Sequence, residues 1–273
     1  MRLEDSGNGR EVSTAHPPID PNRPSAARIY DAYLGGTHNF DADRVVAARA
    51  VELLPETPQI ARANRAFLRR AVRYATGRGI RQFLDLGSGI PTEHNVHEVA
   101  QELAPDARVV YVDLDPTAVL YGRHLLGEDP RTAVVHGDLQ HPAAILAEPE
   151  VRNLLDLTRP VAVLMVAVLH FLPDGPAMDS ALAAYRDAAA PGSVLAVSHL
   201  TSSGDPAQME RVTDLYNRAG TPLVPRDAAQ VARFFEGWRL VEPGLVFGPQ
   251  WRPDGEPVSE PARYLTLAGV GER

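Results

Sequence analysis

The sequence predicts an α/β fold in which a mostly parallel sheet of seven strands carries helices on both faces and follows a helical cap. Strand-like runs alternate with helical patterns from residue 80 to about residue 200, which is typical of a parallel sheet. Before residue 80 the patterns are helical only. The last two strand-like runs, 239–247 and 263–268, have no helical crossover between them, so we expect an antiparallel pair at the sheet edge.

The first 79 residues divide into a tail and a cap. Residues 1–24 are rich in proline, glycine and charge and show no periodicity, which predicts a flexible tail. Residues 25–79 carry helical signals, because Ser25 can cap a first helix and Gly35 and Gly36 then break it. The cap helices are expected at 25–33, from 41 or 43 to about 55, and at about 57–76.

Residues 80–273 are expected to form one further domain, which holds the sheet. Its strands are expected at 80–86, 109–112, 132–135, 161–169, 193–197, 239–247 and 263–268. Its helices are expected at 92–103, 117–126, 177–190, 206–218 and 226–235.

Composition limits the partners of the chain. The 273 residues carry a formal net charge of −8, whereas a duplex-binding protein normally presents a basic stripe to the phosphates. Several arginines cluster at helical spacing, and we interpret them as a solvated helix face whose side-chain stems cover apolar surface. They are Arg62, Arg65, Arg69, Arg70 and Arg73. We therefore expect no nucleic-acid partner.

Two further absences concern location and redox chemistry. The longest apolar run, 161–169, is too short to cross a bilayer and is interpreted as a buried strand, so no membrane partner is expected. The N-terminus is polar and lacks the apolar region of a signal peptide, so the cytoplasm is the expected location. The sequence has no cysteine, which removes disulfides and thiolate metal sites.

The turn after the first predicted strand carries glycines with an acid before them. Gly87 and Gly89 follow the strand and precede a helix, so a ligand can approach the backbone there. The third glycine of a dinucleotide-binding loop would fall at Thr92 and is missing. Asp85 would repel a phosphate but attract a sulfonium or an ammonium group. The pattern favours S-adenosylmethionine over a dinucleotide. The alternative is that Asp85 serves only to hold the loop.

Acids also follow the second and third predicted strands. Asp113 ends the second strand, where a carboxylate can accept hydrogen bonds from both ribose hydroxyls. Asp115 precedes a proline and is interpreted as a helix N-cap. After the third strand, the Asp138 carboxylate can accept from an adenine amino group and the Leu139 main-chain N–H can donate to a ring nitrogen. In isolation, such a Gly-Asp sequence is usually only a turn.

These motifs support a resemblance to a known family. Residues 83–92 and 111–116, together with the N-terminal segment 27–44, resemble the actinobacterial S-adenosyl methyltransferase family, long catalogued as a domain of unknown function. The resemblance implies a Rossmann-like class I methyltransferase fold, S-adenosylmethionine as methyl donor and S-adenosylhomocysteine as product. It implies little about the acceptor.

Two other functions stay open on the sequence. One is a non-catalytic sensor or partner protein that binds the nucleoside, because the donor motif is complete while no acceptor base is unambiguous. The other is an NAD(P)-dependent oxidoreductase, against which Asp85 and the absent third glycine argue.

The N-terminal motif also suggests a lid over the donor. Aromatic and polar residues surround the double glycine, and Tyr30 and Asn39 are the candidates to contact a bound nucleoside. The alternative is that the segment is a capping and packing junction against the sheet.

His170 is the candidate general base. It follows the apolar fourth strand, where its side chain would emerge near the methyl group; His199 has a similar position after the fifth strand. The alternative for each of the two is a purely structural role. His94 and His97 have no evident third ligand, so no metal is expected.

The sequence also suggests what kind of molecule is methylated. The fourth strand lacks the Asn/Asp-Pro-Pro-Tyr/Phe run associated with methylation of planar amino groups. A small-molecule acceptor is therefore expected. The oligomeric state is left open.

Overall fold

One sheet of eight strands is present in the computed structural model, which describes residues 19–91, 94–127, 129–203 and 206–273. The strands are β1 (Gln82–Leu86), β2 (Arg108–Asp113), β3 (Thr132–His136), β4 (Ala162–Val166), β5 (Val194–Leu200), β6 (Arg239–Leu240), β7 (Val246–Phe247) and β8 (Thr266–Glu272). Most of the predicted tail, residues 1–18, and the predicted helix start at residue 92 lie outside the described residues.

The strand order is β3–β2–β1–β4–β5–β8–β6, with β7 also paired to β8. Strands β1 to β5 are parallel, whereas β8 runs antiparallel to β5, β6 and β7. The mostly parallel sheet with antiparallel C-terminal strands is confirmed. The chain order reverses between β1 and β4, which is where open α/β sheets form a ligand crevice at the carboxyl ends of their strands.

The C-terminal strands form the predicted antiparallel pair at the sheet edge, with β8 between β5 and β6, and they differ from the prediction in one way. The run expected at 239–247 splits into the short β6 and β7, because Pro243 has no N–H to donate and Gly244 adopts a φ of +88°.

Alternate residues of the central strands enter two separate cores. Phe83, Val109 and Leu164 pack with α3 (Thr57–Gly77) and α4 (Val96–Leu103) on one face of the sheet. Leu84 and Val110 pack on the other face. This alternation follows from the two-residue period of a strand and explains why β1, β2 and β4 are apolar along most of their length.

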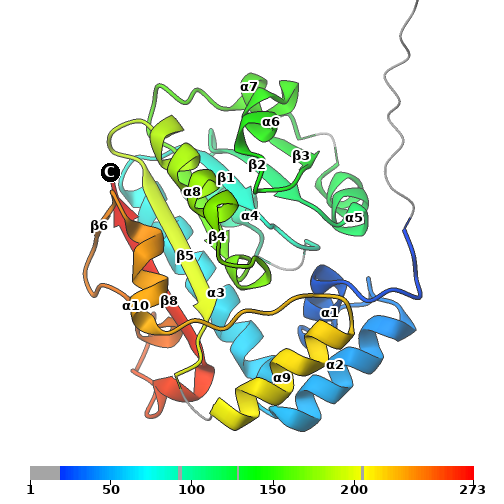
Figure 1. The fold of residues 1–273 in the computed structure, drawn as a ribbon. Coiled ribbons are helices and arrows are strands. Elements are labelled where there is room, and N and C mark those ends of the chain that lie inside the picture. Colours follow the sequence, from blue (N-terminus) through cyan, green and yellow to red (C-terminus); the bar gives the residue numbers. More distant parts are fainter. Residues whose placement is uncertain (1–18, 92–93, 128, 204–205) are drawn as a thin grey trace, which may run out of the picture.

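The remaining helices cover the two faces (Figure 1). Helix α5 (Pro116–Leu126) contacts β2 and β3 and adds Val119 to the α3 core. The opposite face is covered by α6 (Pro142–Ala147), α7 (Pro149–Leu154), α8 (Pro176–Ala188) and α10 (Ala228–Ala232). Short 3-10 helices are η1 (Leu169–Phe171), η2 (Arg233–Phe235), η3 (Gly248–Gln250) and η4 (Pro261–Tyr264). The sequence did not predict α6 and α7, because helices of six residues are too short to show a periodic face.

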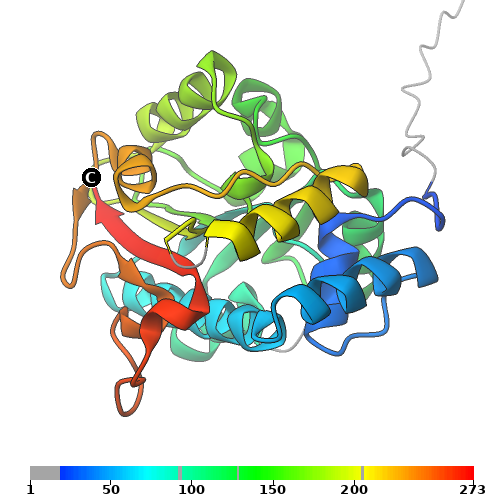
Figure 2. The ribbon, with the colours of Figure 1, turned by 60° about the horizontal axis from the view of Figure 1, so that its bottom comes forward.

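A third apolar cluster forms the cap. It joins α1 (Ala26–Tyr33), α2 (Asp41–Leu53) and the start of α3 to α9 (Pro206–Arg218), which comes from the C-terminal half of the chain. Figures 1 and 2 show α9 lying beside α2. The Tyr33 and Tyr216 hydroxyls are hydrogen-bonded at 2.6 Å across this junction. The cap therefore contains two parts of the chain, where the sequence indicated only the N-terminal one.

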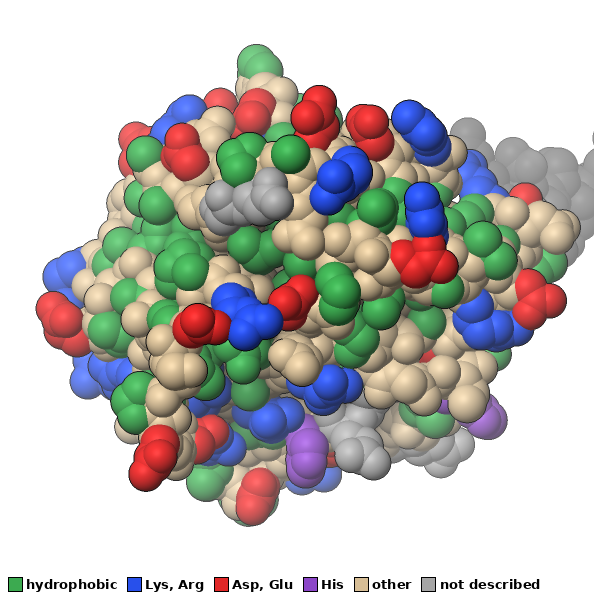
Figure 3. Space-filling model, turned by 90° about the horizontal axis from the view of Figure 1, so that it is seen from below, with side chains coloured by type: hydrophobic (Ala, Val, Ile, Leu, Met, Phe, Trp, Pro, Cys, Tyr) green, Lys and Arg blue, Asp and Glu red, His purple; other side chains and the backbone are tan. Residues whose placement is uncertain are grey.

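The helices and the surface bear on possible partners. No helix among the described residues combines the length and apolar character needed to cross a bilayer. On the face of the molecule seen in Figure 3, basic and acidic side chains are interspersed.

Candidate functional site

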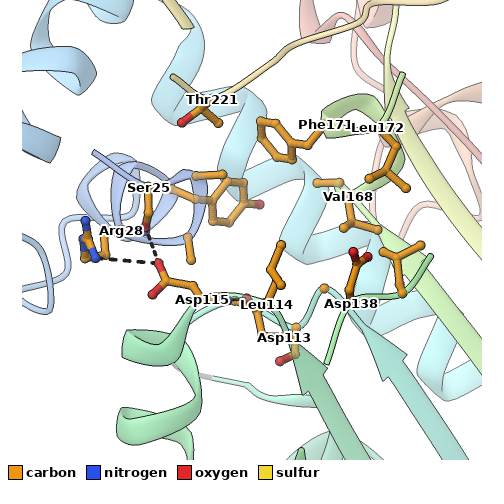
Figure 4. Close-up of a pocket in the computed structure, with 18 of the residues that line it drawn as sticks. Ser25, Arg28, Asp113, Leu114, Asp115, Asp138, Val168, Phe171, Leu172 and Thr221 are labelled. Carbon is orange, nitrogen blue, oxygen red and sulfur yellow. Dashed lines mark hydrogen bonds and ion pairs between the residues drawn. The ribbon is translucent and has the colours of Figure 1, made fainter. Parts of the chain in front are cut away.

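A cavity of about 710 Å³ lies between the carboxyl ends of the parallel strands and the cap. Its lining comes from the ends of β1, β2 and β4, from the turn after β3, from α1 and α3, and from segments 19–24 and 220–222. Figure 4 shows Asp113, Asp115 and Asp138 on one side of it, with Phe171 and Thr221 across from them. The size suits a small ligand.

The two glycines after β1 line the cavity for different reasons. Both have a left-handed backbone, with φ of +74° at Gly87 and +67° at Gly89. A Cβ on Gly87 would lie 2.2 Å from Cγ2 of Val168, so the close approach of Val168 excludes any side chain there. A Cβ on Gly89 would meet no atom within 4 Å. Gly89 therefore leaves open space where a ligand can reach the backbone.

Asp113 joins this loop to the end of β2. Its Oδ2 accepts the backbone N–H of Gly89 at 2.7 Å, and its Oδ1 accepts that of Asp115 at 2.8 Å. Burial raises the pKa of Asp113 to about 6, although these backbone hydrogen bonds oppose the shift. The predicted N-cap role of Asp115 is confirmed, because its Oδ1 accepts the N–H of Thr117 at 2.7 Å.

Asp85 and Arg65 contribute a pair of opposite charges to the lining. Burial raises the pKa of Asp85 to about 7, while the positive charge of Arg65 opposes that shift. Arg65 lies on α3, lines the cavity, and donates from Nη2 to the carbonyl of His94 at 3.3 Å. A carboxylate beside a guanidinium can receive the ammonium and carboxylate groups of an amino acid.

The interpretation of the α3 arginines as one solvated face is wrong for two of them. Arg62 is exposed as expected. Arg70 is buried and donates to the carbonyls of Trp251 at 2.7 Å and Gly248 at 2.8 Å, while Arg65 turns toward the cavity. Helical spacing alone could not reveal this, because the cap and the C-terminal loops cover a helix face that the sequence leaves unpartnered.

The residues predicted for adenine line the cavity after β3. The Oδ1 atom of Asp138 accepts the backbone N–H of Gln140 at 2.9 Å, which fixes the turn. The Leu139 carbonyl accepts from the Tyr185 hydroxyl at 3.1 Å and holds that residue against α8. Because Asp113 pairs with His136 in the β2–β3 register, Asp138 lies near Asp113, the residue predicted to bind the ribose.

The two candidates in the predicted lid have different positions. Tyr30 lines the cavity; its hydroxyl donates to the Ala61 carbonyl at 3.0 Å and accepts from Nδ2 of Asn64 at 3.0 Å. Asn39 does not line the cavity, because its amide donates to Oδ2 of Asp31 at 2.7 Å and to the Gly36 carbonyl at 2.9 Å. For Asn39, these contacts favour the packing alternative.

The cap is tied to the cavity rim by the buried Arg28. Its Nε donates to Asp43 at 2.8 Å and its Nη1 to the hydroxyl of Thr117 at 3.0 Å, at the start of α5. Ser25 caps α1 and also hydrogen-bonds Oδ2 of Asp115. The sequence indicated none of these cross-connections, because the partners are separated by up to ninety residues.

His170 is buried and does not line the cavity. Strand β4 ends at Val166, three residues before the predicted end, and the chain then turns into η1. The Nδ1 atom of His170 accepts the backbone N–H of Leu200 at 3.2 Å. Burial and the nearby His199 and Arg226 hold the pKa of His170 well below its usual range. These contacts give His170 a structural position, and its geometry offers no support for a general base.

The second histidine is also engaged. Nδ1 of His199 hydrogen-bonds the Leu200 carbonyl at 2.6 Å, and Nε2 accepts from Arg226 at 2.8 Å. Burial lowers the pKa of His199 to about 4, so the ring is neutral near pH 7. His199 is therefore part of the buried frame beside the cavity.

The fold and the cavity together define a class I methyltransferase, because the acid-x-Gly-x-Gly loop after β1 and the acids after β2 and β3 meet at the switch point of a doubly wound sheet. Residues 12–273 match the model of the S-adenosyl methyltransferase family, and the chain belongs to that family.

Two solved structures are similar over nearly the whole chain. A protein from Thermobifida fusca YX, assigned as a methyltransferase, is 45% identical with a TM-score of 0.87, covering 92% of this chain and 96% of its own. A DUF574 family protein from Streptomyces avermitilis MA-4680 is 38% identical with a TM-score of 0.86, covering 93% and 99%. Among curated proteins no significant match exists. The protein is thus an S-adenosylmethionine-dependent methyltransferase, and its acceptor is unidentified.

Proposed function

We propose that the cavity binds S-adenosylmethionine with its adenine toward Asp138 and Leu139, its ribose on Asp113, and its amino-acid end toward Asp85 and Arg65. The open backbone at Gly89 supports this assignment, because a Cβ there would meet no protein atom. The order of the acids along the sheet edge also supports it, since Asp138 follows β3, Asp113 ends β2 and Asp85 lies near the end of β1, in the spatial order of the strands. In this proposal the enzyme transfers the methyl group to a small molecule.

The donor supplies a methyl group already activated by a positively charged sulfur, so the protein mainly has to bind, orient and exclude water. Among the described residues that line the cavity there is no histidine and no lysine. We therefore assign the rate enhancement mainly to alignment. In this proposal Asp85 holds the donor's ammonium group and Tyr30 closes the cap side of the cavity.

The test is calorimetry with two ligands that differ only at the amino-acid end. S-adenosylhomocysteine carries that end, whereas 5′-deoxy-5′-methylthioadenosine lacks it. Asp85→Asn and Arg65→Gln should each weaken the binding of S-adenosylhomocysteine by about 1.5–3 kcal/mol, because a charged hydrogen bond is lost. The binding of the second ligand should not change. Asp113→Asn should weaken both ligands, since both contain the ribose.

The exposed Arg62, one helical turn before Arg65, offers a matched control. Arg62→Gln should leave both affinities as in the wild type. If Asp85→Asn and Arg65→Gln also bound S-adenosylhomocysteine normally, the amino-acid end would not lie at these residues. A wild-type protein that bound neither ligand would contradict the donor site as a whole.

A further inference from the structure

Opposite the acids, the cavity has a wall of different chemistry. We call it the apolar wall and define it as Phe171, Leu172, Pro173, Thr221 and Pro222, all of which line the cavity. Figure 4 shows Phe171, Leu172 and Thr221 on the side away from Asp113. The wall has no ionisable side chain, and its one side-chain hydroxyl belongs to Thr221.

The first segment of the apolar wall is held by a buried arginine. Arg226 is 1% exposed and donates to the carbonyls of Leu169 at 3.0 Å and Leu172 at 2.8 Å. His170 accepts from Leu200 through its ring, so the turn that carries Phe171 is attached to β5 as well. These contacts explain why a polar cluster is buried beside the cavity without entering it.

The second segment is attached to the first. The backbone N–H of Val224 donates to the His170 carbonyl at 2.8 Å, and that of Thr221 donates to the Tyr216 carbonyl at 3.0 Å. The Phe171 ring lies 6.3 Å from that of Tyr216. Both segments are thus fixed before any ligand arrives, so little conformational entropy would be lost when a molecule packs on them.

Charge decides what such a wall accepts. A charged group lying against it would lose its hydration without gaining an ionic partner, which is costly. An anion would in addition face Asp113 and Asp138 across the cavity, whereas for a cation these two acids are already covered by the ribose and adenine in the proposed donor complex. An uncharged flat body meets neither penalty, and it can stack on Phe171 and cover Leu172.

Resting on the proposed donor site, the geometry points to an acceptor subsite on the apolar wall, which takes an uncharged molecule with a flat, apolar or aromatic body. Phe171 and Leu172 contact that body, and the Thr221 hydroxyl supplies a polar contact. Arg226 and His170 act as positioning residues that hold the wall.

The test uses three probes built on one ring system with the full-length protein saturated with S-adenosylhomocysteine. The probes are 1-naphthalenemethanol, which is neutral, 1-naphthoate, which is an anion, and 1-naphthylmethylamine, which is a cation near neutral pH. Ligand-observed NMR titration should give the alcohol an affinity at least about tenfold above both charged probes, because burying an unpaired charge is costly.

Variants then locate the probe. Phe171→Ala and Leu172→Ala should each weaken the alcohol about fivefold or more through lost apolar contact, while the S-adenosylhomocysteine affinity stays within about twofold. Thr221→Val keeps the side-chain shape but removes the hydroxyl, and should weaken the alcohol about fivefold. Leu120 is 55% exposed on α5 outside the cavity, so Leu120→Ala should change nothing and serves as control.

Each failure has its own meaning. Equal binding of the charged probes, no binding of the alcohol, or unchanged affinity in the Phe171 and Leu172 variants would overturn the apolar acceptor subsite. Loss of S-adenosylhomocysteine binding by the wild type would instead overturn the proposed donor site. If Phe171→Ala does not fold, Phe171→Leu removes the ring with less loss of volume, and the same reduction is expected.

Discussion

The Asp113 carboxylate accepts the backbone N–H of Gly89 at 2.7 Å, so the acid at the end of β2 holds the glycine loop at the end of β1. The two residues are 24 positions apart in the chain, and Gly89 follows β1, the parallel neighbour of the strand that Asp113 ends. Asp113 therefore has two roles in our account, because it orders the loop and offers the same carboxylate to the ribose.

Replacing Asp113 by alanine should affect the loop as well as the ligand. Asp113→Ala should weaken S-adenosylhomocysteine by about 1.5–3 kcal/mol and also speed hydrogen exchange of the Gly89 amide in the ligand-free protein. Calorimetry and exchange mass spectrometry measure the two effects. Asp106, an exposed acid on the protein surface, provides the control Asp106→Ala. Unchanged exchange at Gly89 would show that the hydrogen bond does not order the loop.

Donor affinity should depend on pH through Asp85. Its pKa in the ligand-free protein is raised to about 7, and only the ionised carboxylate attracts an ammonium group. The affinity for S-adenosylhomocysteine should rise about tenfold between pH 6 and pH 8, with most of the rise absent in Asp85→Asn. The affinity for the ligand without the amino-acid end should change by at most about twofold over the same range, because only the titration of Asp113 affects it. If the affinity of Asp85→Asn rose equally steeply with pH, a group other than Asp85 would cause the pH dependence.

The same raised pKa should influence stability. Between the ordinary aspartate value and about 7, the folded protein binds more protons at Asp85 than the unfolded chain does. The contribution of Asp85 to the free energy of unfolding therefore falls as pH rises through this window. Urea unfolding at several pH values should show that wild type and Asp85→Asn differ in their free energy of unfolding, and that this difference shrinks toward low pH. A pH-independent difference would contradict the buried, proton-binding position of Asp85.

The two glycines should fail in different ways when replaced. Gly87→Ala should mainly lower stability, because its Cβ would collide with Val168 and its φ of +74° is strained for alanine. Adding Val168→Ala to Gly87→Ala should restore part of the lost stability. Gly89→Ala should cost about 1–2 kcal/mol of stability for its φ of +67° and, in addition, obstruct the donor. Wild-type donor affinity in Gly89→Ala would show that the loop does not touch the ligand.

His170→Ala should behave as a structural variant. Removing the imidazole leaves the partly buried Leu200 N–H without this acceptor, which costs about 1–3 kcal/mol. Because burial holds the pKa of His170 below its usual range, the unfolded chain takes up a proton at this residue as pH falls below the ordinary histidine value, whereas the folded protein does not, and the wild type loses stability. The variant should therefore lose less stability than the wild type on acidification. Thermal unfolding checks this, and S-adenosylhomocysteine affinity should stay unchanged.

Much of the donor cavity could be predicted because its residues belong to short segments at strand ends. Asp85, Gly87, Gly89, Asp113, Asp138 and Leu139 all line one cavity. Their proximity follows from a local fact, since each lies at the end of a parallel strand or shortly after it, and parallel strands end at one edge. Asn39 and His170 do not follow such a rule. Their hydrogen bonds to Asp31 and Leu200 depend on how a cap turn and a strand end are packed.

The sequence by itself determined the doubly wound sheet, the cap before it and the donor motif, because hydrophobic periodicity and turn residues are local properties of the chain. Only the tertiary structure decided that α9 joins the cap, that Arg65 enters the cavity while Arg62 remains in solvent, and that the apolar wall faces the acids. These features depend on which distant surfaces pack together. Such packing is set by the summed burial of many side chains, and no short segment encodes it.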